Sequence, residues 1–147
     1  MKRKWLILVG LSVLAGCMTA PVPLASPDAD AASKKFQPPV GKANLYVAWS
    51  GGPSAVHFKV AVDGKNVASI EPGTFYLETL DPGQHYLTVS SGLNTAREGL
   101  NAEAGKNYYY EVTSSSDDYT AKPSLGLVIT GAMGKLMVNQ NKLVAGE

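Results

Sequence analysis

The residue best suited to covalent chemistry is Cys17, the one cysteine of the chain. It follows the small residues Ala15 and Gly16, which come after a mostly apolar run over residues 5–13 and a basic start over residues 2–4. A basic start, an apolar run and small residues before a cleavage point are typical of a secretion signal. Because sulfur is the nucleophile that a lipobox requires at this place, the pattern predicts a lipobox that ends at Cys17.

This N-terminus resembles that of bacterial lipoproteins. The resemblance implies that a diacylglycerol donor alkylates the Cys17 thiol, that residues 1–16 are removed, and that the new amino group is acylated. Two or three acyl chains hold a protein stably on a membrane, whereas one chain binds marginally. We therefore expect lipid attachment at Cys17 and a membrane as the first partner.

Two other interpretations of the same residues fit less well. An uncleaved transmembrane helix would need about 20 apolar residues, and the run before Cys17 is shorter. A cleaved signal with an unrelated cysteine would place the chain's one cysteine on the lipobox position by coincidence. In lipoproteins of enterobacterial type, a residue other than Asp after the lipidated cysteine favours the outer membrane, and Met18 stands here. The expected location is the outer membrane facing the periplasm, with the inner membrane as the alternative.

The charge of the chain argues against nucleic acid as a partner. The formal net charge is +1, of which Lys2, Arg3 and Lys4 supply three positive charges, so the exported part carries −2. A near-neutral chain lacks the basic field that attracts a phosphate backbone. With Cys17 lipidated, no thiol remains for a disulfide, a metal or catalysis.

The chain has two histidines, His57 and His85. Neither has a second histidine or a cysteine at ligand spacing, so the sequence predicts no zinc site. His57 falls on the polar face of an alternating segment, where we expect solvent exposure. His85 follows Pro82 and Gly83, where its ring can hydrogen-bond the local backbone and hold the turn. Because no nucleophile accompanies either ring, we expect no enzyme, no cofactor and no catalytic residue.

The acidic residues also favour structural roles. Asp117 and Asp118 lie in a serine-rich stretch, and a calcium loop would supply more acidic ligands at alternate positions, so a solvated loop is expected. Glu71 and Asp81 each precede a Pro-Gly pair, where a carboxylate can accept a hydrogen bond from the backbone of the turn.

Aromatic residues are the remaining candidates for a binding surface, since their faces stack on sugars and peptides. Packing in the core is the favoured interpretation, and alternation places Tyr108 and Tyr110 on one face of a strand and Tyr109 on the other. The other aromatic residues considered are Tyr46, Trp49, Phe75, Tyr76 and Tyr86.

The elements that must position these residues are predicted to be strands. Over residues 56–62 large apolar side chains alternate with His57, Lys59 and Ala61, and Asp63-Gly64 is a strong hairpin signal, so 66–70 is the returning strand. Pro-Gly turns then bound the next two strands. The expected strands are 43–49, 56–62, 66–70, 74–80, 84–90, 97–102 and 107–113.

Short strands about every ten residues, without helical periodicity, predict an all-β fold with a single antiparallel β-sandwich, immunoglobulin-like or transthyretin-like, over residues 41–147. Residues 17–40 are rich in Pro, Ala and Ser and are expected to form a flexible tether. Residues 114–122 are expected to be a loop. For residues 125–138 we expect a last strand pair, 125–130 and 135–139, with a surface that docks on a partner or a membrane as the alternative.

The segment from Ala32 to Val47 resembles the opening of a family of small bacterial lipoproteins catalogued as domain of unknown function 2846. The resemblance continues through the Val-Asp-Gly-Lys hairpin at residues 62–65 and the Pro-Gly-x-His turn at residues 82–85, and it covers most of residues 36–138. The hairpin and turn are also similar to the PEGA type of surface-associated β domain. Both resemblances imply a sandwich fold, and neither implies an activity. The loop over residues 50–54 is shorter than this resemblance implies.

These observations predict a lipid-anchored module of the cell envelope that binds a protein or a glycan and is not an enzyme. The alternatives are a carrier of a small apolar ligand, which needs an apolar cavity between the sheets, and an envelope hydrolase. The hydrolase would gain support from His85 beside an exposed Ser or Asp in a cleft.

Overall fold

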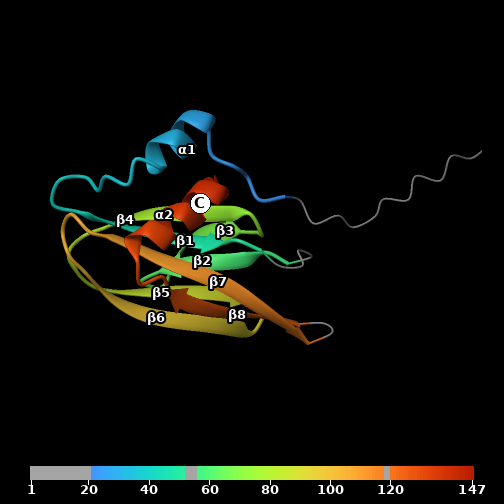
Figure 1. Ribbon diagram of the computed structural model, residues 1–147. Coiled ribbons are helices and arrows are strands. Elements are labelled where there is room, and N and C mark those ends of the chain that lie inside the picture. The colour runs from blue at the N-terminus through green and yellow to red at the C-terminus, as the bar shows by residue number, and fades with distance from the viewer. Residues whose placement is uncertain (1–20, 52–55, 118–119) are drawn as a thin grey trace, which may run out of the picture.

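The protein is a sandwich of two β-sheets with two helices on one outer face (Figure 1). This computed structural model describes residues 21–51, 56–117 and 120–147. The first sheet has the order β8 (Thr120–Leu127), β7 (Asn107–Asp117), β1 (Ala43–Trp49), β4 (Thr74–Leu80) and β9 (Lys142–Leu143). The second has the order β3 (Lys65–Ile70), β2 (Phe58–Val62), β5 (Gly83–Ser91) and β6 (Asn94–Ala102).

The predicted all-β sandwich is confirmed. The second sheet is antiparallel throughout, whereas the first is mixed, because β1 runs parallel to β7 and β4 runs parallel to β9. The seven strands expected from alternation and turn residues are all present. The hairpin after β2 turns at Asp63 and Gly64, whose φ angles of 51° and 83° are those that an Asp-Gly turn supplies at low cost.

β1 is the centre of the fold and is buried along its whole length. Leu45, Val47 and Trp49 point between the sheets into the main core. Tyr46 and Ala48 point to the opposite face, where they pack with Phe75 and Tyr109 in a second cluster. A strand buried on both faces requires a third layer outside the sheet.

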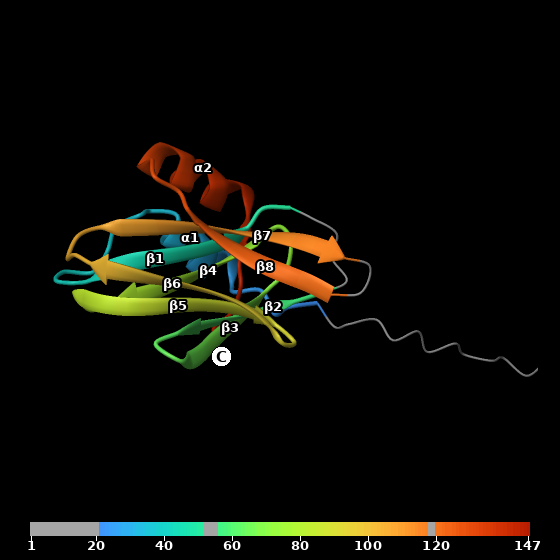
Figure 2. The same ribbon diagram turned by 90° about the horizontal axis from the view of Figure 1, so that it is seen from below.

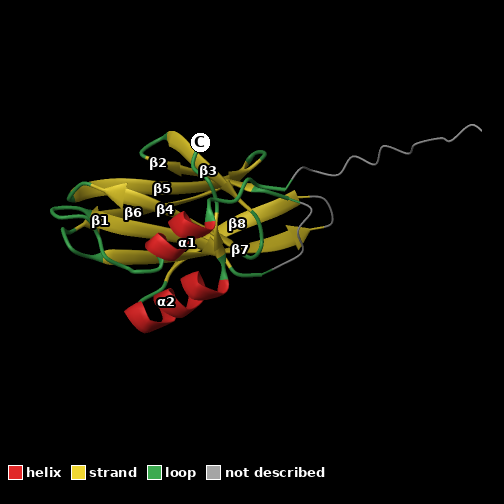
Figure 3. Ribbon diagram, turned by 90° about the horizontal axis from the view of Figure 1, so that it is seen from above, coloured by secondary structure: helices red, strands yellow, loops and turns green. Residues whose placement is uncertain are grey.

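That third layer is formed by α1 (Pro27–Ser33) and α2 (Gly131–Gln140). The view from below shows α2 over the outer face of the first sheet, and the view from above shows α1 next to it (Figures 2 and 3). α2 buries Met137 and Val138 on the second cluster. Gly134 permits this approach, since a Cβ atom there would lie 2.3 Å from Cγ of Tyr109.

Residues 21–40 differ from the predicted tether, because they fold against the sandwich. Val22 is buried, and Leu24 forms a β-bridge with Val144. Ser26 caps α1 by accepting a hydrogen bond from the amide of Ala29 at 3.2 Å, and Pro27 occupies the first turn. Ser and Pro, which favour disorder by composition, are here the residues that begin a helix.

Two predictions for the C-terminal part are wrong. The expected loop over 114–122 is instead the end of β7, paired up to Asp117, and the start of β8. The expected strand pair over 125–139 is instead the end of β8 followed by α2, which begins after the N-cap Thr130. The two glycines of α2 have low helix propensity, and the helix is stabilised by its packing on the sheet rather than by its sequence.

No helix within the described ranges is long and apolar enough to cross a membrane. The predicted signal peptide and Cys17 lie outside those ranges, so the lipobox stays a prediction from sequence.

Candidate functional site

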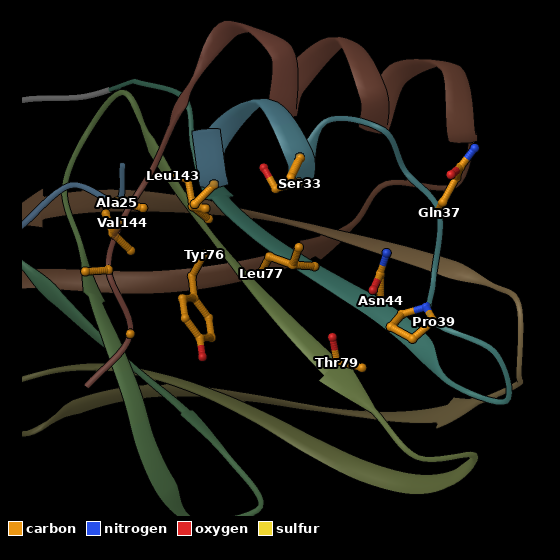
Figure 4. Close-up of a pocket in the computed structure, with 14 residues that line it drawn as sticks. Ala25, Ser33, Gln37, Pro39, Asn44, Tyr76, Leu77, Thr79, Leu143 and Val144 are labelled. Carbon is orange, nitrogen blue, oxygen red and sulfur yellow. The ribbon is translucent and has the colours of Figure 1, made fainter. Parts of the chain in front are cut away.

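The candidate site is the flank of the sandwich where β4 lies near β3, because two hollows open there. The first hollow has a volume of about 510 Å³ and lies between α1, β4 and the segment after β9 (Figure 4). The second has a volume of about 310 Å³ and lies between β4, the β2–β3 hairpin and the start of β5. Tyr76 and Thr79 of β4 line both hollows, so the strand separates them.

α1 forms one wall of the first hollow, and a polar network holds it there. Lys34 donates hydrogen bonds to Asp30 Oδ2 at 2.7 Å and to the carbonyl of Asn141 at 2.8 Å. Asp30 Oδ1 accepts a bond from the amide of Leu143 at 2.8 Å. Burial by itself would raise the pKa of Asp30, but the bonds from Lys34 and Leu143 together with the nearby positive charges lower it. The docked position of α1 therefore favours the ionised form of the Asp30 carboxylate.

A second polar bond ties the end of α1 to β1. The hydroxyl of Tyr46 donates to the carbonyl of Ser33 at 2.9 Å and accepts from the side chain of Asn44 at 3.3 Å. Burial, with a contribution from Tyr109, raises the pKa of Tyr46 to about 12, so the hydroxyl stays protonated and can donate.

His85 lies in the second hollow with both ring nitrogens hydrogen-bonded. Nδ1 lies 2.7 Å from Asp63 Oδ2, and Nε2 lies 2.8 Å from the carbonyl oxygen of Asp81. Both partners are acceptors, and a neutral imidazole carries one N–H, so the ring makes both bonds only when it is protonated. The hydrogen bond to Asp63 raises the pKa of His85, and the bond from His85 lowers the pKa of Asp63.

The predicted role of His85 is confirmed, and two predicted carboxylate roles are wrong. The His85 ring does bond the backbone of the turn at Asp81. The Asp81 side chain instead forms an ion pair with Lys42, which lowers its pKa. Glu71 does not cap its own turn; its carboxylate accepts a bond from the amide of Val22 at 3.4 Å, and the Thr74 side chain closes the turn.

His57 is half-buried rather than solvent-exposed. Its Nε2 lies 3.2 Å from Glu71 Oε2, and the two side chains are 25% and 27% exposed. His57 and His85 are not brought together, since they pair with different carboxylates. The described residues contain no group of three or more His, Cys, Asp or Glu side chains that could hold a metal ion.

The predictions for the aromatic residues are confirmed in most cases. Tyr110 belongs to the main core with Tyr108 packed against it, whereas Tyr109 lies in the opposite cluster. Tyr86 is the exception, because it is 43% exposed and the guanidinium carbon of Arg97 lies 4.3 Å from its ring centroid. The buried residues among those predicted are Tyr46, Trp49, Phe75, Tyr109 and Tyr110.

Several large apolar side chains are exposed around the end of β8 and the start of α2. Leu127 and Leu136 are about half exposed, and Ile129 is 90% exposed. Met133 is also exposed. The predicted loop over 50–54 and the pair Asp117-Asp118 fall partly outside the described residues, so their predicted roles stay predictions.

The sequence did not point to Leu77 and Thr79 as site residues, and it named Tyr76 only among the aromatic candidates, for which packing in the core was favoured. Their strand was predicted, but the hollows beside it exist because α1 and the β2–β3 hairpin stand on either side of β4. The signal that was available was the N-cap pattern of Ser26 and Pro27, which would have indicated α1.

No protein-family model matches the chain. A protein of Haemophilus influenzae described only as uncharacterized is 27% identical over 107 residues. The match covers 69% of this chain, and the chain spans 61% of the length of that relative.

Proposed function

We propose that the protein is a lipid-anchored module of the bacterial cell envelope, held at Cys17, that binds a protein or glycan partner and is not an enzyme. The resemblance to small lipoproteins and to PEGA-like domains supports this class. The proposed location is the outer membrane, facing the periplasm.

The observation that supports the proposed lipid anchor is the sequence before Cys17. There a basic start, an apolar run and two small residues precede the chain's one cysteine. The folded part supplies a scaffold for binding. Its sheets are fixed by a continuous core, while the flank beside β4 leaves two hollows lined by backbone and side chains. Binding sites commonly combine such a rigid frame with an open edge.

The anchor is tested by the variant Cys17→Ser in the native host. We expect it to lose labelling by a palmitate analogue and to leave the membrane fraction, whereas Met18→Ala keeps both. A Cys17→Ser product that is still processed and still membrane-bound would refute the anchor. Separation of inner and outer membranes of cells with the unaltered protein tests the location.

Binding is tested by photo-crosslinking in intact cells from Gly51, Thr79 and Leu136, which lie in three different parts of the surface. We expect a discrete crosslinked species from at least one position that is absent without illumination. The absence of any crosslink at all three positions would contradict a binding module.

One observation favours the hydrolase alternative, because His85 lies beside the half-exposed Asp63 in the second hollow. However, Nε2 of His85 faces the carbonyl of Asp81. A general base needs an unshared pair on that nitrogen and a nucleophile within reach, so this His–Asp pair is better suited to holding two turns together. The carrier alternative is less well supported, since both hollows flank β4 whereas the space between the sheets holds the main core.

A further inference from the structure

The outer edge of β4 is paired along only part of its length. β9 pairs with Thr74 and Phe75, and the amide of Val144 donates to the carbonyl of Phe75 at 2.9 Å. The chain then turns away, because the amide of Ala145 donates to Pro23 and that of Glu147 donates to Val67. Within the part of the chain that the structure describes, no strand pairs with this edge beyond Phe75.

The direction of the backbone N–H and C=O groups on the unpaired edge can be inferred from their direction on the paired part. The carbonyl of Phe75 faces β9, and in a strand every second residue directs its N–H and C=O to the same side. Leu77 and Thr79 therefore present their N–H and C=O groups outward. These four groups are the donors and acceptors that an added strand would pair with.

The two hollows lie where the side chains of an added strand would go. Successive side chains of an extended chain point to opposite faces of a sheet. The first hollow lies on one side of β4 and the second on the other, and Tyr76 and Thr79 are common to both. A segment laid along the edge would place alternate side chains in the two hollows.

The two hollows differ in chemistry. The first presents apolar groups of Ala29, Ala32, Pro39, Leu77 and Val144. It therefore suits an apolar side chain.

The second hollow is lined by four carboxylates, those of Asp63, Glu78, Asp81 and Glu147, and by the cations Lys65 and His85. His85 pairs with Asp63, and Lys42 pairs with Asp81. The two remaining carboxylates, Glu78 and Glu147, outnumber the remaining cation, Lys65. The second hollow therefore carries a net negative charge, which suits a Lys or Arg side chain.

We propose that the outer edge of β4 binds an extended segment of a partner protein as an added strand, with an apolar side chain in the first hollow and a Lys or Arg side chain in the second. This inference rests on the proposed function as a binding module and assigns its site and the class of its partner. Strand addition draws affinity from main-chain bonds and specificity from alternate side-chain pockets.

The first test uses the full chain in zwitterionic detergent micelles and a synthetic hexapeptide of alternating valine and lysine with blocked ends. We expect the peptide to shift the amide resonances of Leu77 and Thr79 in a saturable way. A matched peptide that is N-methylated at every second residue keeps its charge and its apolar side chains. It cannot donate backbone hydrogen bonds from one of its two edges. It is expected to bind at least about tenfold more weakly.

The second test varies the protein. Thr79→Pro removes one outward N–H from an edge position and is expected to weaken peptide binding about tenfold. Glu78→Gln removes a charge of the second hollow and is expected to weaken binding about threefold, whereas the exposed Glu103→Gln leaves it unchanged. Unchanged amide resonances of β6 in each variant verify that the fold is retained.

Three results would overturn the inference: no shift at Leu77 and Thr79, equal binding of the methylated peptide, or occupation of this edge by a second copy of the chain in the absence of peptide. The cellular crosslinks separate this inference from the proposed function. Crosslinks from Gly51 or Leu136 with none from Thr79 would refute the β4 edge and leave the binding module standing, whereas no crosslink from any position would refute both.

Discussion

The two helices cover the same outer face of the first sheet, but they are held there by different forces. α2 buries Met137 and Val138 on an aromatic surface and brings Gly134 against the ring of Tyr109. α1 is held by hydrogen bonds that join Asp30 and Lys34 to the backbone of the segment around β9, and these two side chains also form an ion pair with each other.

The difference matters because apolar packing depends on shape, whereas charged hydrogen bonds depend on protonation. α2 covers the sheet as part of the core. α1 covers it as an attached wall of the first hollow, so its docking can respond to pH while the sandwich remains folded.

The largest effect is expected from filling the space between α2 and the sheet. Gly134→Ala places a methyl group at 2.3 Å from the Tyr109 ring, and we expect the free energy of unfolding to fall by about 2 kcal/mol despite the better helix propensity of alanine. Chemical denaturation measures this. Gly131→Ala is the control, since its Cβ would meet nothing within 4 Å. Equal stability of the two variants would show that α2 is not closely packed.

The next effect is expected at the polar attachment of α1. Lys34→Met keeps the aliphatic stem but removes the bonds to Asp30 and to the carbonyl of Asn141, at a local cost of about 1.5 kcal/mol. Hydrogen exchange should accelerate at the amide of Leu143 and in α1, while α2 stays protected. The exposed neighbour Lys35→Met should leave exchange unchanged. Faster exchange in α2 as well would contradict independent docking of the helices.

A smaller effect is expected at the hydroxyl groups of Tyr46 and Tyr109, whose stacked rings have centroids 5.1 Å apart. Tyr46→Phe leaves the carbonyl of Ser33 without its donor and is expected to cost about 1 kcal/mol. The buried hydroxyl of Tyr109 has no hydrogen-bond partner among the described residues, so Tyr109→Phe should be neutral or stabilising. A larger loss for Tyr109→Phe than for Tyr46→Phe would reverse the assignment of these hydroxyls.

The smallest effect is expected on the docking of α1 when the pH is lowered. The pKa of Asp30 is lower in the folded protein than in the unfolded chain, so its contribution is present above the unfolded pKa and is lost as the pH falls through the folded pKa. Exchange of α1 amides, corrected for the intrinsic rate, should therefore rise toward acid pH. The α2 amides should not follow, and Asp30→Asn should remove the dependence. A parallel rise in both helices would indicate global unfolding instead.

The strands were predictable because their signals are local. Residues 58–62 alternate in apolarity, Asp63-Gly64 supplies the turn, and Pro-Gly pairs bound β4 and β5, so each element carries its own boundaries. The role of His85 was also predictable, because its partner at Asp81 lies four residues away.

The remaining elements were not predictable in the same way. The polar end of β7 and start of β8 form strands because they pair with each other. α2 contains two glycines that disfavour a helix, and its burial against Tyr109 compensates for them.

By itself, the sequence determined the expected anchor at Cys17 and the rhythm of strands and turns, since both depend on residues close together in the chain. The tertiary structure alone decided that residues 21–40 would close over β4, because Asp30 and Lys34 must meet Leu143 and Asn141 from the other end of the chain. It also decided that one edge of β4 would stay open between two hollows, because an open edge is defined by where other segments stop.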